Sequence, residues 1–312
     1  MTLQDIVAFC NQLAKINVQT DSQNTVRALE AIVYTVTNSK VQSQDLAQQL
    51  DRQFQDIRQD LHNFDKIIAT IHSNLVTVLA ANDQRCIDQD CERYKIELDI
   101  ETVDMIQNRA VTQTTAGLEK LTARIKLLAD WRMPGMIFRP TAEAWMQDLV
   151  TLDPLYIVDH DQALLQPFMA QFNELYQRRL RPYVLDKHID AGVLSQLPDD
   201  QYGLILAYNF LNYKPLPLMK IYLSEILKKL RPGGTLLFTF NDCDIAQNMG
   251  LWERMFMMYQ PWRLLKPYLD ELAVEIVSVN HDGGDMVWAE VRRLGQLVSL
   301  RGAQTLAKIV AM

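Results

Sequence analysis

Residues Glu225–Phe240 read EILKKLRPGGTLLFTF, and the architecture can be worked out from this segment. Its first part continues an amphipathic helical pattern that begins at Met219, and its last part is an apolar, strand-like run. Pro232 cannot continue a helix, and Gly233 and Gly234 permit a tight reversal of the chain. The segment therefore predicts a helix, a sharp turn and a buried strand in succession.

Similar apolar runs lie on both sides of this segment, with helical stretches between them. They are MIF (136–138), LYIV (155–158), PYVL (182–185), GLILAY (203–208) and TLLFTF (235–240), followed by AVEIVSV and MVWAEVR on either side of the turn NHDGGD. Among the stretches between them, a long helix is expected from Gln162 to about Leu180. Strands that alternate with helices and end in a hairpin predict an α/β fold. The expected sheet is doubly wound, seven-stranded and mostly parallel, with a terminal antiparallel hairpin.

Proline and glycine are distributed very unevenly along the chain. Residues 1–133 contain no proline and a single glycine, Gly117, whereas residues 134–312 contain all eleven prolines. Because both residue types interrupt helices, the first part is predicted to be almost entirely helical. Two domains are expected. Residues 1–133 form a helical, coiled-coil-like oligomerisation region, and residues 134–312 form an α/β domain with a C-terminal helical tail.

Apolar residues in the first part follow a heptad pattern over more than four heptads. The series, in steps of three and four, is Leu46, Leu50, Phe54, Ile57, Leu61, Phe64, Ile68, Ile71, Leu75 and Val78, and the same spacing returns at Leu118, Leu121, Ile125 and Leu128. Such a seam is covered either by a local helical hairpin or bundle or by a coiled coil between subunits. We expect a homo-oligomer through these helices, dimeric or trimeric. The polar segment Ala80–Cys91 fits either a turn between two helices or the solvated middle of one long helix.

The composition is that of a folded chain without a membrane segment. It has 312 residues, 48% of them hydrophobic and 22% charged, and no run of about 18 apolar residues. A net charge of -7 and a pI near 5.3 argue against nucleic acid as the main partner. The N-terminus lacks a signal-peptide pattern, and the four cysteines are too few for a disulfide framework and fit no zinc spacing. We expect reduced thiols, no metal site and a cytoplasmic location.

The Leu-Arg-Pro-Gly-Gly turn and its strand, within seven strands in this order, resemble class I S-adenosylmethionine-dependent methyltransferases. That family often reads L-K/R-P-G-G before its fifth strand, and the resemblance covers about residues 135–293. It implies S-adenosylmethionine as the cofactor and methyl transfer to an acceptor that the sequence does not identify. The stretches RPGG, FNDCD and SLRGAQTLAKIV also resemble methyltransferase-like proteins of large tailed bacteriophages. A phage origin would put the chain in the host cytoplasm or the virion.

Two acidic strand ends match cofactor positions of that family. Asp159 ends the second strand in YIVDHD, and the resemblance implies that its carboxylate accepts hydrogen bonds from both ribose hydroxyls. Alternatively, Asp159 or Asp161 caps the helix that begins near Gln162. His160 either lines the adenosine or is a loop histidine. Asp186, at the end of the third strand, resembles the acceptor of the adenine amine, or is an exposed strand-end aspartate.

The turn after the first strand departs from the family. A glycine-rich turn, D/E-x-G-x-G, normally lets the backbone approach the cofactor there, whereas this chain reads Arg139-Pro140-Thr141-Ala142-Glu143. In one interpretation, Arg139 pairs bidentately with the cofactor's carboxylate, and Pro140, Thr141 and Glu143 belong to the same pocket. In the other, Arg139 is a surface or interdomain salt-bridging residue and cofactor binding has been lost.

The loop after the fourth strand reads Tyr208-Asn209-Phe210-Leu211-Asn212-Tyr213. The resemblance implies that this loop faces the transferring methyl group. Amide-methylating members of the family read N-P-P-Y here, and Asn209 with Phe210 matches only the first half of that motif. Asn209, Asn212 and Tyr213 are therefore the catalytic candidates, and Tyr208 is counted with the cofactor-binding residues.

Two other functions are weighed against methyl transfer. A catalytically inactive methyltransferase-like scaffold would act as a structural or assembly protein through its helical region, and the rewritten first turn favours it. A nucleotide-binding oxidoreductase would want G-x-G-x-x-G after the first strand, and the closing hairpin argues against it. Methyl transfer is the leading expectation, with the scaffold as its alternative.

Overall fold

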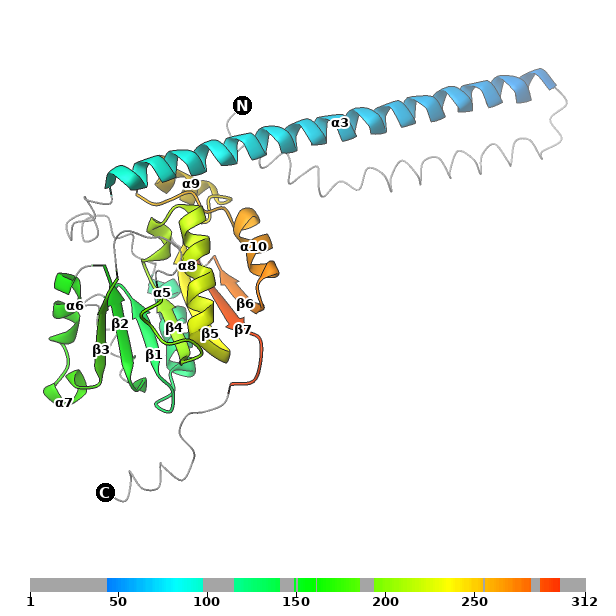
Figure 1. Cartoon of the computed structure of the whole chain (residues 1–312). Helices are drawn as coiled ribbons and strands as arrows, with labels where there is room; N and C mark the ends of the chain where they lie inside the picture. The colour runs from blue at the N-terminus through cyan, green and yellow to red at the C-terminus, as the bar shows by residue number, and fades with distance from the viewer. Residues whose placement is uncertain are drawn as a thin grey trace. The chain divides into compact units, whose positions relative to one another are not determined.

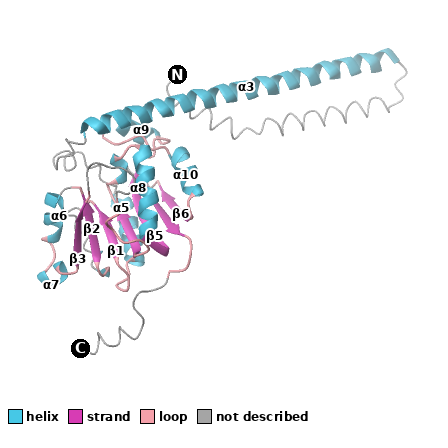
Figure 2. Ribbon diagram, in the orientation of Figure 1, coloured by secondary structure: helices cyan, strands magenta, loops and turns pink. Residues whose placement is uncertain are grey.

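The computed structural model describes residues 44–97, 115–140, 149, 151–160, 162–185, 194–254, 256–281 and 287–297. Seven strands form one sheet in the order β3-β2-β1-β4-β5-β7-β6 (Figures 1 and 2). They are β1 (Gly135–Phe138), β2 (Leu155–Asp159), β3 (Leu180–Val184), β4 (Tyr202–Ala207), β5 (Leu230–Phe240), β6 (Val274–Asn280) and β7 (Val287–Arg293). The first five are parallel, and β7 runs antiparallel to both β5 and β6. The predicted sheet and its closing hairpin are confirmed.

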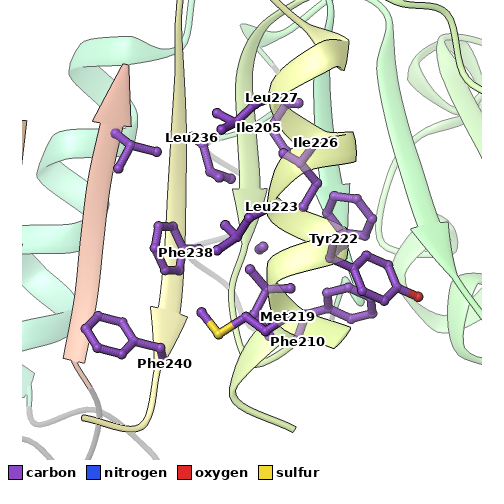
Figure 3. Packing of buried hydrophobic residues seen from close by; sticks show 14 of the residues in the cluster. Ile205, Phe210, Met219, Tyr222, Leu223, Ile226, Leu227, Leu236, Phe238 and Phe240 are labelled. Atoms are coloured by element: carbon purple, nitrogen blue, oxygen red, sulfur yellow. The ribbon is translucent and has the colours of Figure 1, made fainter. Parts of the chain in front are cut away.

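Helices cover both faces of this sheet (Figure 1). On one face, α8 (Leu216–Lys229) and α10 (Trp262–Glu271) pack on alternate residues of the strands, including Ile205 and Phe238. Figure 3 shows part of this packing, with side chains of α8 against those of β5. On the other face, α5 (Thr115–Leu128) and α6 (Gln162–Met169) pack on the intervening residues. Two apolar layers thus enclose the sheet, as the continuous apolar runs of parallel strands require.

The helix expected from Gln162 to about Leu180 is wrong in its extent. It ends as α6 at Met169, and a separate turn, α7 (Glu174–Gln177), precedes β3. The cause is Asn173, whose side chain accepts a hydrogen bond from the backbone N–H of Tyr176 at 2.9 Å and so starts a new helix. Leu180 already belongs to β3.

The heptad region forms one uninterrupted helix, α3 (Gln44–Glu97), of 54 residues. Of the two alternatives for Ala80–Cys91, the structure has one long helix and no turn. The expected solvation is wrong, because Asp83, Cys86 and Asp90 are buried. The chain divides into two compact units, Met1–Arg85 and Cys86–Met312, so the last turns of α3 belong to the unit that carries the sheet. Within the described residues, no helix combines the length and the apolar character needed to cross a membrane.

The Pro-Gly-Gly residues, expected to form a turn, lie within β5 at an irregularity in its pairing with β4, and Gly233 meets a backbone constraint there. Helix α8 ends at Lys229, and Gly233 then takes a φ of +77°. A Cβ atom at this position would also lie 2.4 Å from the backbone N of Leu297. Both the left-handed conformation and the close approach therefore require glycine.

Replacing Gly233 with alanine is expected to destabilise the fold by about 1–3 kcal/mol, because the backbone must be strained or displaced. Gly250 is a matched control: it lies in α9 (Ala246–Glu253), and a Cβ atom there would meet nothing within 4 Å. Gly250→Ala should be neutral or stabilise by up to about 1 kcal/mol. Chemical denaturation of both variants tests this, and equal stabilities would contradict it.

Candidate functional site

The order of the strands reverses between β1 and β4. From β1 the chain proceeds outward to β2 and β3, and it then returns to the other side of β1 with β4 and β5. Open α/β sheets bind ligands outside the carboxyl ends of their strands at such a switch point. The pairs Phe138 with Val158 and Ile137 with Leu206 keep the ends of β1, β2 and β4 level. The residues that follow these strands therefore meet at one edge.

Arg139 and Asp159 form a buried ion pair at this edge. Arg139 directly follows β1 and is 2% exposed, and Asp159 ends β2 and is 0% exposed. The Nε atom of Arg139 lies 3.7 Å from Oδ2 of Asp159. The other carboxylate oxygen accepts a hydrogen bond from the backbone N–H of His160 at 2.6 Å. Arg139 is thus no surface residue, and its charge compensates a carboxylate that could not otherwise stay ionised in the interior.

The backbone of Arg139 is strained, because its φ is +48°. Its N–H nevertheless extends the sheet by donating to the carbonyl oxygen of Val158 at 2.8 Å. A left-handed conformation is unusual for arginine and costs about 1–3 kcal/mol, which the surroundings must offset. Residues held in this way cluster at ligand-binding and catalytic sites.

Phe210, in the loop after β4, fills the space beside this ion pair. Its ring stacks on Phe138 with centroids 4.8 Å apart, and His160 lies at 6.0 Å. The guanidinium carbon of Arg139 lies 5.4 Å from the Phe210 centroid, and Nζ of Lys214 lies 5.3 Å from it. Two buried cations therefore face one aromatic ring, an arrangement that stabilises both charges in a low-dielectric environment.

The remaining described candidates occupy different surroundings. His160 is buried, and its Nε2 is hydrogen-bonded to the hydroxyl of Tyr222 in α8 at 3.0 Å. Tyr208 is buried on the opposite face of the sheet, the one covered by α5. Tyr213 faces the site, with its ring 6.0 Å from the guanidinium of Arg139. Pro140 is buried directly after Arg139. Three further candidates, Thr141, Glu143 and Asp186, lie outside the described residues.

The loop after β4 places Asn209 and Asn212 against β5. Asn209 has a φ of +51°, and its N–H donates to Oγ1 of Thr239 at 2.8 Å. The same hydroxyl lies 3.3 Å from Oδ1 of Asn212. Asparagine tolerates this left-handed conformation better than most residues. Two of the three catalytic candidates of the loop, Asn209 and Asn212, therefore contact one threonine of β5.

Buried amide groups gather around the carboxyl ends of β4 and β5. Within the described part of the chain, the amide atoms without a hydrogen-bond partner are Asn209 Oδ1, Asn212 Nδ2, Asn241 Oδ1 and both side-chain atoms of Asn248. Each such atom lowers the stability of the fold by about 1–3 kcal/mol when it is buried without a water molecule. Native proteins keep groups of this kind where water or a polar ligand binds. These loops therefore offer buried amides suited to hydrogen bonding.

The loop after β5 supplies one acid and one thiol. Asp242 is buried, and its Oδ1 accepts from the backbone N–H of Trp262 at 2.9 Å, at the start of α10. Burial raises the pKa of Asp242, although the hydrogen bond from Trp262 and the nearby His281 oppose that shift. Burial also raises the pKa of Cys243, so its thiol is protonated near neutral pH. These groups hold the loop and start a helix.

Several residues that shape this edge were not candidates in the sequence. They are Asp90, Lys214, Thr239, Asn248 and Gln260, all of which are buried. Lysine and aspartate are usually exposed, so no sequence signal indicated that Lys214 and Asp90 are internal. Asn241 lies in a loop that the sequence did single out, and its amide donates to the backbone of Asn248 and Met258.

The chain matches no protein-family model and, in sequence, no curated protein. Among solved structures it resembles the [4+2]-cyclase SpnF, with 14% identity over 59% of this chain and 85% of that chain and a TM-score of 0.46. It also resembles the N-methyltransferase NodS from Bradyrhizobium japonicum with S-adenosyl-L-homocysteine (14% identity, 56% and 86% of the two chains, TM-score 0.41). The DhpI–SAH complex is 15% identical over 68% of this chain and 98% of that chain, with a TM-score of 0.43. Likeness at this level does not establish a shared reaction, because such sheets host many functions.

Removing the cation of the buried pair is expected to be costly. Arg139→Ala leaves the Asp159 carboxylate buried without its compensating charge, which costs about 3–5 kcal/mol. Arg132→Ala is the control, because Arg132 pairs with Asp130 at an exposed position and should change stability little. The measurement is the free energy of unfolding in urea for both variants. Similar values for the two would show that the Arg139–Asp159 pair contributes no more than a surface pair.

Proposed function

We propose that this protein is an S-adenosylmethionine-dependent methyltransferase whose cofactor site lies at the switch point between β1 and β4. The observation that carries the proposal is the buried pair of Arg139 and Asp159 at that point. A carboxylate that can accept from vicinal hydroxyls thus lies beside a guanidinium that can bind a carboxylate. S-adenosylmethionine carries both groups, so the donor set fits this cofactor in its chemistry.

The residues of the site would bind and orient rather than perform acid–base chemistry. Asp159 would accept from the ribose hydroxyls, and Arg139 would bind the carboxylate of the ligand. The hydroxyls, together with the backbone N–H of His160, would then serve as the donors to Asp159. His160 and Phe210 would contact the adenosine side. The bound cofactor supplies a methyl group on an activated sulfonium. Positioning of the acceptor can therefore suffice without a strong base.

The acceptor would bind at the amide-rich edge formed by the loops after β4 and β5. Asn209 and Asn212 could hold a neutral polar acceptor through hydrogen bonds, and Tyr213 could pack on it. Asp242 is engaged at the start of α10, which argues against a role as the general base.

Calorimetric titration with S-adenosylmethionine and S-adenosylhomocysteine tests the cofactor site. We expect micromolar binding by the natural chain and at least about tenfold weaker binding by Asp159→Asn, since the amide offers one acceptor oxygen in place of two. Asp130→Asn, at an exposed position after α5, is the matched control and should bind normally. Absence of heat and of a thermal shift at millimolar ligand would refute the proposal.

A second function, a catalytically inactive scaffold, is favoured by one specific observation. The Arg139 guanidinium is already buried beside Asp159, so the two charges compensate each other without any ligand. A phage origin, with the chain as a virion or assembly component, belongs to this proposal. The same titration decides between the two functions, because a scaffold of this kind would bind neither compound.

Self-association through α3 is proposed for either function. In the unit Met1–Arg85, three members of the heptad series, Phe64, Ile71 and Val78, are exposed, whereas Ile68 and Leu75 are half-buried. Their spacing follows the heptad repeat, which a second helix with the same repeat covers best. The partner we propose is a second copy of this chain.

Replacing Ile71 with lysine would put a charge into this seam and should shift the chain from an oligomer toward a monomer. Ser73→Lys is the control, because Ser73 is exposed on the same helix but lies off the seam. Light scattering coupled to size-exclusion chromatography gives the mass of each variant. A natural chain that is monomeric at all concentrations, or equal masses for the two variants, would contradict the proposal.

A further inference from the structure

The last turns of α3 form hydrogen bonds with the segments that follow β5. Asp90 is 1% exposed, and its two carboxylate oxygens accept from two different donors. Oδ2 accepts from the backbone N–H of Tyr259 at 2.5 Å, and Oδ1 accepts from Nε1 of Trp252 at 2.9 Å. One residue of α3 therefore holds both the end of α9 and the segment that follows it.

Two neighbours of Asp90 extend this attachment. The guanidinium of Arg93 donates to the carbonyl oxygen of Met257 at 3.3 Å and contacts Sδ of Met258 at 2.8 Å. The hydroxyl of Tyr94 accepts from Nζ of Lys214 at 2.8 Å, and Lys214 is fully buried. Asp90, Arg93 and Tyr94 thus contact both the segment 256–261 and the end of the loop after β4.

The segment 256–261 in turn holds the loop after β4. The N–H of Met258 donates to the carbonyl oxygen of Asn212 at 3.0 Å. The side-chain amide of Gln260 donates to the carbonyl oxygens of Leu211 and Lys214, at 2.6 and 2.7 Å. Its Oε1 accepts from the backbone N–H of Asn241 at 3.0 Å. A continuous series of hydrogen bonds therefore connects Asp90 to the loop that carries Asn209 and Asn212.

We propose that Asp90 is a positioning residue for the loop Tyr208–Lys214, which makes the end of α3 part of the candidate active site. It acts through Tyr259 and Gln260, and Tyr94 supports the same loop through Lys214. The proposal rests on the proposed function only for the role of that loop, because the attachment itself is independent of any cofactor. The positioning requires both oxygens of Asp90, since each one accepts from a separate buried donor.

Asp90→Asn separates positioning from simple packing, because asparagine fills the same space but offers one acceptor oxygen and an NH₂ group that faces a donor. Hydrogen exchange by NMR, without any ligand, is measured at the amides of Met258, Lys214 and Asn241, which do not contact Asp90 themselves. We expect exchange about tenfold faster or more at these amides. The amides of Ile137 and Leu206, in the centre of the sheet, should be unchanged.

Asp88→Asn is the matched control, because Asp88 is exposed on the same turn of α3 and loses the same charge. The proposal is overturned if Met258, Lys214 and Asn241 exchange equally in the two variants. It is also overturned if Ile137 and Leu206 accelerate as much as the loop, since Asp90 would then support the whole unit. If Asp90→Asn does not fold, Tyr94→Phe decides: faster exchange at Lys214 supports the proposal, and unchanged exchange overturns it.

A failure here is distinguishable from a failure of the proposed function. The chain could bind no S-adenosylmethionine while exchange in the loop still depends on Asp90. In that case the positioning role of Asp90 stands and the proposed methyltransferase function is refuted. Conversely, the chain could bind the cofactor normally while Asp90→Asn leaves exchange in the loop unchanged. In that case the methyltransferase function stands and the positioning role of Asp90 is refuted.

Discussion

An ionised carboxylate is stable inside a protein only beside a compensating charge or several donors, and at the end of β2 Arg139 supplies that charge. Other features of this edge follow from the need to bring a guanidinium to Asp159. The backbone of Arg139 takes a positive φ, and Phe210 packs beside the cation. A glycine turn would bring backbone N–H groups to a ligand at this point, whereas this chain brings a side chain.

Strained backbone conformations and unpaired buried amides lie at the same edge of the sheet. Arg139 and Asn209, which follow β1 and β4, both have left-handed backbones, and the buried amides near β5 include atoms without a partner in the described chain. A chain selected for stability alone would replace such groups with apolar ones. These groups lie at the carboxyl ends of β1, β4 and β5, next to the apolar cluster that contains Phe210, Leu223 and Ile226 (Figure 3), and a binding edge would account for them.

The strands could be predicted because parallel strands are buried on both faces and therefore appear as unbroken apolar runs, such as GLILAY and TLLFTF. The end of α6 could not, since the helical apolar pattern continues past the point where Asn173 caps a new turn. At the site, the position of Asp159 followed from its place after a strand. The burial of Lys214 and Asp90 could not be predicted from the sequence, because it depends on tertiary contacts with residues distant in sequence.

Helix α3 joins the two roles proposed for its ends. The exposed heptad side chains lie in the unit Met1–Arg85. Asp90 and Tyr94, which hold the loops, lie in the unit Cys86–Met312. The helix contains no proline or glycine along its length. Helix formation is cooperative, so a partner that stabilises the seam also stabilises the last turns. Association would thus strengthen the attachment of the loop after β4. The proposed seam and the proposed positioning residues therefore belong to one continuous helix.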